Sequence, residues 1–590
     1  MRATEYVEPS CIILSIIHYR QAKNQMNIKR FNKPSIHITI LILTVLVFYA
    51  HTFDSGFMFD DYPQQHMLKL IKDNQREMNM FNFITSPEEV SKYTQMTAIP
   101  WWSSPKWRLK YFRPVATFSH LIDYTLWGSN PLPYHINNVL WYSLLVILLY
   151  VFYQSFCNHR AMAFCGALVF AMEPCHYITV RWPASRNDII CATFLVLSFI
   201  CYLHFCKKRK PLHNILFLLS YILALLTKEL AFLFPVLIFA YDLSRFKRFK
   251  EMLKCQWKVY LSLFIINSTH FIFYMTNNYG SYWYGETSFK DYLLEFLKAD
   301  SLYLCSLFYG VVIAALSPDV FSRFWFIIIV LLLFLFYIVY LIWKERKQYP
   351  EVSLFILWVF LLLPFIIVPP INDRLLLIPS IGYAYLAALA ICKLGKKKLA
   401  VFFVVTSLLL PPVIQVIQTY GYHEGLESNY EQLYSELDEI VVQKDSRDRL
   451  FFLNFPKVSL SGENYMYLAL YFDIYYHYPQ WEVPVYPLSA FDDSISVEIL
   501  DNHHLKISHP SRFYFETNTE KLFSLERTFS QGETFTLPDV KITIDDMEGE
   551  KVKSIEVEFA EPIDSPFYYF LFFDEGEWQR WYPKEKETPF

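Results

Sequence analysis

Residues 324–343 read FWFIIIVLLLFLFYIVYLIW, twenty residues without a charge. About 20 apolar residues in a helix are enough to cross the hydrocarbon core of a membrane. Comparable stretches recur along the first 420 residues, and the clear ones are 35–53, 136–156, 188–205, 260–276, 352–369, 375–392 and 399–420. The sequence therefore predicts a polytopic α-helical membrane protein.

Three further apolar stretches decide the number of spans. Residues 161–174 are few but strongly apolar, and residues 212–243 are long enough for a hairpin of two spans broken at Lys228 and Glu229. Residues 302–316 are apolar but short, so we expect them to lie in the membrane without crossing it, or along its outer face. This assignment predicts 11 spans; a crossing at 302–316 would make 12.

Clusters of Lys and Arg in short loops predict the orientation, because such clusters stay in the cytoplasm. Five clusters fall on one side if the N-terminus is inside and there are eleven spans. Residues 1–34 are then cytoplasmic, residues 35–420 form the transmembrane domain, and the first outer loop is 54–133. Residues 421–590 are extracytoplasmic. The chain starts at Met1 or Met26, and no cleavable signal is evident.

Composition separates two bodies that meet near residue 420. Of all residues 54% are hydrophobic and only 18% charged, with a mean hydropathy of +0.22, which argues against a soluble enzyme, a disordered chain and a nucleic-acid-binding protein. Residues 421–590 hold 33 acidic and 14 basic side chains, a net charge of −19. A short helix at 426–442 and strands at 496–500, 540–544, 554–559 and 568–573 predict a mainly β domain there.

Cysteines and sequons bear on the compartment. None of the ten cysteines lies in residues 421–590, so no disulfide framework is expected there, and no spacing indicates zinc. The N-x-Ser/Thr sequon found, at Asn267, lies inside a predicted span. Both features favour a bacterial inner membrane, with the endoplasmic reticulum membrane as the alternative.

Ionisable and amide side chains gather at the predicted outer ends of the spans, where such residues are costly and therefore suggest function. They are Asp60, Asp61, Arg113, His135, Asn138, Glu173, His176, Arg186, Asp188, Lys228, Glu229 and Arg374. Adjacent carboxylates can supply a general base, and the planar fork of arginine suits phosphate. The set would suit transfer from a lipid-phosphate donor to a hydroxyl group.

Structural roles compete with these assignments. The Asp60–Asp61 pair could be part of a solvated loop, and His135 and His176 could be hydrogen-bonding residues at the interface. Arg186 with Asp188, and Lys228 with Glu229, could be ion pairs that hold their loops in place.

Five segments, in this order along the chain, carry a resemblance to a known family. They are FMFDD at 57–61, FRPVATFSHLIDYTLWGSNPLPYHINN at 112–138, AMEPCHYITVRWPASRND at 171–188, TKE at 227–229 and DRLLLIPSIG at 373–382. The chain resembles the GT-C superfamily of membrane glycosyltransferases, and most closely the transmembrane-and-tetratricopeptide-repeat O-mannosyltransferases and their bacterial relatives.

The resemblance implies transfer of a sugar from a polyprenyl-phosphate donor to an extracytoplasmic acceptor, with inversion at the anomeric carbon. It implies that the catalytic acid in the first outer loop is Asp60 or Asp61. Arg374, Arg186 and Lys228 are then the candidates that bind the donor phosphate. The supporting candidates are Arg113, His135, Asn138, Glu173, His176, Asp188 and Glu229.

Two departures from the family limit what the resemblance implies. The family's HP-x-H-x-E pattern is Glu173-Pro174-Cys175-His176-Tyr177-Ile178 in this chain, so the metal ligands are unknown and a divalent metal is left open. An acidic β domain replaces the helical repeats, so the acceptor is left open among protein, glycan and lipid. Membrane lipid is the other expected partner, and nucleic acid is not.

Two other functions remain as alternatives. One is a transporter or flippase for a lipid-linked glycan, and the other is a non-catalytic membrane assembly protein. A transporter should carry ionisable residues near mid-membrane or paired broken helices. The gathering of such residues at one face favours the enzyme.

Overall fold

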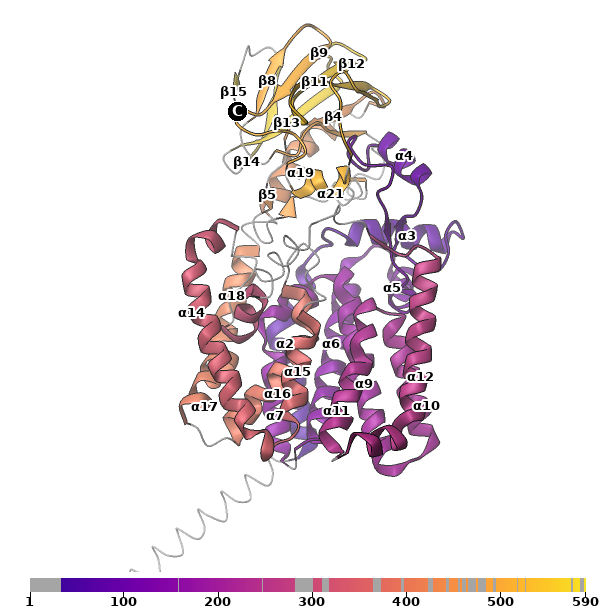
Figure 1. Ribbon diagram of the computed structural model, residues 1–590. Coiled ribbons are helices and arrows are strands. Elements are labelled where there is room, and N and C mark those ends of the chain that lie inside the picture. Colours follow the sequence, from indigo (N-terminus) through magenta and orange to yellow (C-terminus); the bar gives the residue numbers. More distant parts are fainter. Residues whose placement is uncertain are drawn as a thin grey trace, which may run out of the picture.

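The computed structural model places a bundle of helices below a β-rich region (Figure 1). It describes residues 33–157, 159–246, 248–281, 301–309, 318–363, 373–393, 397–422, 428–441, 445–454, 457–458, 463–464, 474–475, 484–491, 495–516, 518–525, 527–574, 577–583 and 588–589.

Six helices within these described residues are long and apolar enough to cross a membrane. They are α2 (Pro34–Tyr49) with η1 (Ala50–Asp54), α6 (Pro131–Gln154), α9 (Arg186–Lys208) preceded by η3 (Pro183–Ser185), α12 (Phe249–Thr276), α14 (Pro318–Trp343) with η6 (Lys344–Lys347), and α17 (Lys397–Val404) with η9 (Val405–Leu409) and α18 (Leu410–Tyr422). A bent pair, α7 (Arg160–Ala171) followed by η2 (Pro174–His176) and α8 (Tyr177–Arg181), makes a seventh if it is counted as one span. The chain is therefore a multi-pass membrane protein.

Shorter helices complete the bundle. They are α10 (Pro211–Leu225), α11 (Phe234–Arg245), α15 (Val352–Leu362) and α16 (Pro379–Cys392). The predicted hairpin at 212–243 is divided into α10 and α11 by a 3₁₀ turn, η4 (Glu229–Leu233). Residues 301–309 are helical, but 310–316 of the predicted non-crossing segment lie outside the described residues. The helical membrane body is confirmed, whereas the count of eleven spans is not.

Local sequence explains where several helices begin. Proline occupies the first helical position of α2, α6, α10 and α16, where its missing N–H is not needed. The side chain of Asn130 also accepts a hydrogen bond from the backbone N–H of Leu132 at the start of α6. Gly382 lets α16 approach α15 closely, because an added Cβ would lie 2.6 Å from the carbonyl oxygen of Phe355.

Residues 54–133, the predicted first outer loop, are folded. They contain α3 (Asp61–Lys72), β1 (Asn82–Ile84), α4 (Pro87–Gln95), β2 (Leu109–Lys110) and α5 (Pro114–Trp127). A third strand, β3 (Gly280–Ser281), follows α12 and pairs antiparallel with β2. The outer loop is thus tied to the end of a transmembrane helix that lies 170 residues later in the chain.

Two main sheets form the C-terminal region. One has the order β10-β11-β12-β9-β8-β15 and the other β14-β13-β4-β7, in which β4 runs parallel to both neighbours. The strands are β4 (Arg449–Phe452), β7 (Val485–Pro487), β8 (Ser496–Ile499), β9 (His504–Ser508), β10 (Thr534–Thr536), β11 (Val540–Glu548), β12 (Lys551–Phe559), β13 (Tyr568–Asp574), β14 (Glu577–Trp581) and β15 (Thr588–Pro589). All four predicted strands fall on β8, β11, β12 and β13, and the predicted helix on α19 (Ser428–Val441).

The outer loop and the C-terminal region share one hydrophobic core, in which Trp101, Trp102 and Trp107 are buried. Hydrogen bonds join the two parts: the Ser104 N–H donates to the carbonyl of Phe523 at 2.7 Å, and the Val485 N–H donates to Thr97 Oγ1 at 3.0 Å. The β-rich region therefore packs on the loop that carries Asp60 and Asp61, at one end of the bundle (Figure 1).

Candidate active site

The turn at residues 58–61 joins the first span to α3, and Asp61 holds it in place. Oδ2 of Asp61 accepts the backbone N–H of Met58 at 3.0 Å, and Oδ1 accepts that of Ala184 at 2.7 Å. Phe59 has φ +44°, a backbone conformation that is rare for a bulky residue. Such strain concentrates at functional sites when surrounding contacts enforce it, and the Asp61 side chain, in a residue only 2% exposed, supplies two of those contacts here.

Asp60 differs from its neighbour because its carboxylate remains open. It is half-buried, and within the described part of the chain no hydrogen bond or ion pair engages it. Burial raises the pKa of Asp60, while the guanidinium groups of Arg374 and Arg113 oppose that rise. Burial also raises the pKa of Asp61, and the charge of Asp60 adds to that rise. The nearby cations therefore favour the ionised form of Asp60, and its burial opposes that form.

Trp182 links Arg374 to the 58–61 turn. Its guanidinium sits 4.7 Å from the centre of the Trp182 ring, and the Trp182 Nε1–H donates to the carbonyl of Met58 at 3.2 Å. The Phe59 ring meets the Trp182 ring edge-on at 5.8 Å. Arg374 belongs to η8 (Asp373–Leu376), so the fold brings together segments more than 300 residues apart in sequence.

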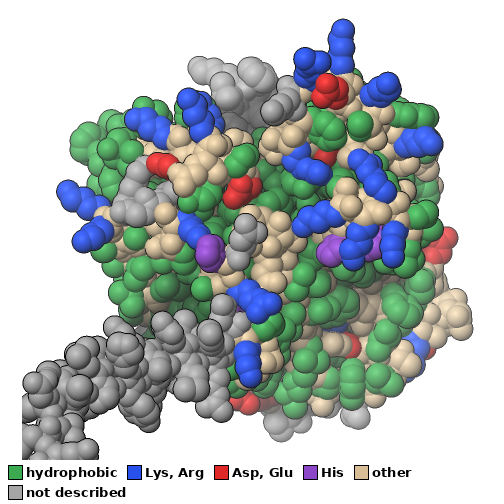
Figure 2. Space-filling view, turned by 90° about the horizontal axis from the view of Figure 1, so that it is seen from below, with side chains coloured by type: hydrophobic (Ala, Val, Ile, Leu, Met, Phe, Trp, Pro, Cys, Tyr) green, Lys and Arg blue, Asp and Glu red, His purple; other side chains and the backbone are tan. Residues whose placement is uncertain are grey.

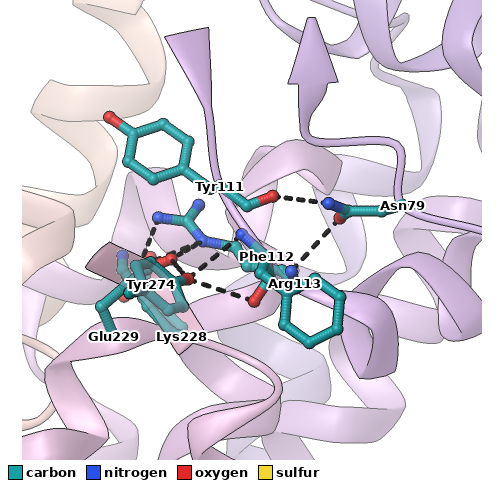
Figure 3. A network of polar contacts seen from close by, with 8 residues as sticks. Asn79, Tyr111, Phe112, Arg113, Lys228, Glu229 and Tyr274 are labelled. Atoms are coloured by element: carbon teal, nitrogen blue, oxygen red, sulfur yellow. Dashed lines mark hydrogen bonds and ion pairs between the residues drawn. The ribbon is translucent and has the colours of Figure 1, made fainter. Parts of the chain in front are cut away.

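Arg113 is held by a carboxylate on the other side of the site (Figure 3). Its Nη2 donates to Glu229 Oε2 at 2.7 Å and its Nε to Glu229 Oε1 at 3.1 Å. The Tyr274 hydroxyl, at the upper end of α12, donates to the same Oε1 at 2.6 Å and accepts the Phe112 N–H at 3.1 Å. Arg113 is thus oriented by two elements besides its own.

Lys228 and Glu229 are not partners of each other, so the alternative in which they form an ion pair is excluded. Lys228 Nζ contacts Asp188 Oδ1 at 2.5 Å, whereas Glu229 binds Arg113. The reason is local: Lys228 has an extended backbone (φ −158°, ψ 142°), and consecutive side chains of an extended segment point to opposite sides. Burial lowers the pKa of Lys228, and the charge of Asp188 opposes that change.

Arg186 is bound on all sides by protein acceptors, which does not suit a phosphate ligand. Its fully buried guanidinium pairs with Asp123 at 2.5 Å and donates to Asn138 Oδ1 at 2.6 Å and to the Tyr134 carbonyl at 2.9 Å. The alternative pair with Asp188 does not form, because residues two apart in a helix do not face each other. Arg186 and Asn138 instead join α5, α6 and α9.

His176 and Glu173 lie at the bend between α7 and α8 and form a closed cluster. His176 Nδ1 contacts the Tyr142 hydroxyl at 2.7 Å and Nε2 contacts Ser380 Oγ at 2.7 Å, so both ring nitrogens are used. Glu173 is buried, and His135 Nε2 contacts the Gly56 carbonyl at 3.2 Å. Across the described residues there is no group of three or more His, Cys, Asp or Glu side chains arranged to hold a metal.

Comparison with known proteins identifies relatives of one kind. No protein-family model matches the chain. It is similar to protein O-mannosyl-transferases. Protein O-mannosyl-transferase TMTC2 of Mus musculus is 31% identical over 100 residues, which cover 17% of this chain and 12% of that protein. TMTC3 of Mus musculus is 21% identical over 184 residues (30% and 18%), and TMTC4 of Homo sapiens is 28% identical over 171 residues (27% and 21%).

These matches confirm the resemblance to the transmembrane O-mannosyltransferases that the five segments predicted, at low identity and over part of the chain. The chain matches about an eighth to a fifth of the length of these relatives. The activity, substrates and partners of this protein are therefore matters for proposal.

The structure adds three residues that sequence reasoning missed. Asp123 is an acid on an otherwise apolar helix in the stretch SHLIDY, a signal that could have been used. Trp182 was noted only as part of a motif, and its role between Met58 and Arg374 depends on tertiary contacts. Tyr274 stands in an apolar span with no signal in the sequence around it.

Proposed function

We propose that this chain is an integral membrane glycosyltransferase that moves a sugar from a polyprenyl-phosphate donor to a hydroxyl group outside the cytosol. One observation carries the proposal: Asp60 presents an open, half-buried carboxylate on a strained turn, within the electrostatic reach of Arg374 and Arg113. This arrangement supplies a base for the acceptor and cations for a departing phosphate.

The reaction is a single displacement at the anomeric carbon. Asp60 accepts the proton of the acceptor hydroxyl while that oxygen forms a bond to the anomeric carbon. The bond from that carbon to the phosphate oxygen breaks, and the polyprenyl phosphate leaves with the bonding electrons. Because attack and departure occur on opposite faces, the configuration inverts. A positioned general base contributes about 10²- to 10⁴-fold to such a step.

The other predicted residues divide into two roles. Arg374 is the first candidate for the donor phosphate, because it lies beside the 58–61 turn on the Trp182 ring. Arg113 and Lys228, each paired with an acid, complete the positive side of the site. Asp61 is a positioning residue for the turn, and Arg186, Asn138 and His176 have structural roles because protein groups occupy their polar atoms.

The topology that fits this function has eleven spans. They are α2, α6, α7 with α8, α9, α10, α11, α12, α14, α15, α16, and α17 with α18. Lys and Arg gather on the face opposite the β-rich region, which supports placing that face in the cytosol (Figure 2). The packing of residues from 421–590 on the outer loop 54–133 supports placing both on the extracytoplasmic side.

The names of the relatives supply the first substrates to test. They are called protein O-mannosyl-transferases, so mannose is the first sugar and a protein hydroxyl the first acceptor that we propose. The relatives compared above come from Mus musculus and Homo sapiens. This origin favours the endoplasmic reticulum membrane over a bacterial inner membrane, because animal cells lack the latter.

Transfer of labelled mannose from a polyprenyl-phosphate donor by the purified full-length chain in lipid nanodiscs tests the proposal. Asp60→Asn should lower transfer about 10³-fold, and Asp54→Asn, which changes an exposed acid at the start of the same loop, should leave it intact. Equal transfer by Asp60→Asn and wild type would refute Asp60 as the base. If labelled donors yield no product while a lipid-linked glycan crosses the bilayer, the chain is a transporter. A chelator in the same assay determines whether a divalent metal is needed.

A further inference from the structure

The first turns of α12 carry two parallel stripes of exposed side chains. The apolar stripe consists of Phe249, Leu253, Trp257 and Leu261, and the basic stripe of Lys250, Lys254 and Lys258. Each stripe repeats every four residues, so its members lie along one side of the helix. Phe249 and Trp257 are 52% and 53% exposed, and Lys258 Nζ lies 5.7 Å from the centre of the Trp257 ring.

α12 is longer than a membrane requires. Its 28 residues span about 42 Å at about 1.5 Å per residue, compared with a hydrocarbon core of about 30 Å. The Tyr274 hydroxyl ties the upper end of the helix to the candidate site, and the charged residues all lie in the first ten positions. The surplus of about two turns therefore falls at the lower end, at the depth of lipid headgroups.

A second basic segment lies against this end of α12. Lys207, Lys208, Arg209 and Lys210 form the turn between α9 and α10 and are all exposed. Arg209 Nη1 donates to Gln256 Oε1 of α12 at 3.3 Å, and Gln256 Nε2 contacts Cys206 Sγ at 3.5 Å. The two basic segments, some 40 residues apart in sequence, therefore make one surface.

A buried acid below this surface holds the three helices in register. Asp242 of α11 is fully buried and accepts hydrogen bonds from the hydroxyl groups of Tyr202 in α9 and Tyr260 in α12. Within the described residues, no ion pair joins Asp242 to the exposed lysines of this surface. Glu251, the exposed acid on the same turn of α12, pairs with Arg248 at 3.6 Å. Among the described residues, no ion pair engages Lys207, Lys208, Lys210, Lys250 or Lys254.

We propose that this surface binds the headgroups of anionic phospholipids in the leaflet opposite the β-rich region. Lysines at headgroup depth attract anionic lipids, and tryptophan favours the same interfacial layer. The lower face in Figure 2 displays Lys and Arg side chains beside hydrophobic ones, as such a surface requires. The orientation of a membrane protein depends on how many positive charges a loop carries, not on their spacing. On α12, by contrast, each lysine follows an exposed apolar side chain, and the pair repeats every four residues.

Lipid retention by the purified full-length chain tests this proposal without reference to any enzymatic activity. The protein is equilibrated with mixed micelles of phosphatidylserine and phosphatidylcholine, and the bound lipids are counted by native mass spectrometry. We expect wild type to retain phosphatidylserine preferentially. Lys250→Gln with Lys254→Gln and Lys258→Gln should reduce that preference roughly tenfold or more. A matched control replaces Lys347, Lys397 and Lys398, three exposed lysines elsewhere on basic segments, with glutamine and should retain most of it.

Equal losses in the two triple variants would overturn the proposal, because they would indicate a response to total charge alone. Binding of inorganic phosphate as strong as that of phosphatidylserine in the same mass-spectrometric measurement would also overturn it, in favour of a free-anion site. Wild type gives a second measurement if the triple variant fails to fold. Its phosphatidylserine preference should fall as KCl rises from about 0.1 M to about 0.5 M, and a preference that salt does not change would contradict the proposal.

Discussion

Two turns at the ends of apolar helices carry acids, and they differ in whether protein groups enclose those acids. In the 173–176 turn, Glu173 is buried, and both ring nitrogens of His176 are hydrogen-bonded, one to Tyr142 and the other to Ser380. In the 58–61 turn, Asp61 is closed by two backbone N–H groups while Asp60 remains open beside two arginines. Asp61 thus holds the turn, and Asp60 is left as the acid that we propose reacts. The comparison teaches that two neighbouring acids can differ in their surroundings: the carboxylate of Asp61 fixes the backbone of the turn, and that of Asp60 stays without a hydrogen-bond partner among the described residues.

The largest expected effect separates the two acids of the 58–61 turn. Asp60→Asn should lower sugar transfer about 10³-fold, because it removes the base, and should leave thermal unfolding unchanged. Asp61→Asn should lower both the transfer rate and the unfolding temperature. The amide nitrogen of asparagine cannot accept a hydrogen bond, so the N–H of Met58 or of Ala184 would lose its acceptor. Transfer and unfolding are measured on the same purified samples. If Asp60→Asn destabilised the chain as much as Asp61→Asn, the division between open and closed acids would fail.

The closed side of the comparison predicts a loss of stability. Arg186→Met should lower the free energy of unfolding by about 3–5 kcal/mol, because it leaves Asp123 buried without its cation. Arg186→Met with Asp123→Leu should recover most of that loss. Denaturant unfolding in detergent measures both variants. A double variant no more stable than the single one would mean that Arg186 acts through something other than this pair.

The open side predicts a change in pH dependence. Arg374 lowers the pKa of Asp60, so Arg374→Gln should raise that pKa further. A base is active when deprotonated, so transfer is present above its pKa and is lost as pH falls through it. The acidic limb of the pH–rate profile should therefore move to higher pH. Transfer should also fall about 10²-fold, because the departing phosphate loses a cation that stabilises its charge. Arg374→Lys keeps the charge and should move the limb less; an unmoved limb in Arg374→Gln would separate Arg374 from Asp60.

The smallest effect concerns the network that orients Arg113. Tyr274→Phe removes the hydroxyl that binds Glu229 and Phe112 and should cost about 1 kcal/mol. We expect this cost to appear in KM for the donor. Tyr582→Phe, an exposed tyrosine of the β-rich region, serves as the control. The orienting role would be contradicted if Glu229→Gln and Tyr274→Phe showed fully additive effects.

Much of the architecture follows from local pattern. The apolar run at 324–343 lies within α14, and the break at Lys228 separates α10 from α11. The strand-like runs at 540–544 and 554–559 predicted β11 and β12. The span count is less certain from sequence because several of the apolar helices, such as α10 and α15, are shorter than a membrane crossing. The partners of charged side chains did not follow from the sequence. Neither ion pair considered as an alternative between near neighbours forms, and Arg186, Asp188 and Glu229 pair with residues distant in sequence.

The sequence by itself determined that this chain lies in a membrane, where its β-rich region begins and which loop carries paired acids. These properties depend on runs of residues within one element, and hydrophobic runs and alternation report them directly. Only the tertiary structure decided that Asp61 accepts two backbone hydrogen bonds while the Asp60 carboxylate accepts none among the described residues. It also decided that Arg186 pairs with Asp123, 63 positions away. Coulombic and hydrogen-bonding partners are chosen by distance in space, and spatial distance between helices is set by how their side chains pack.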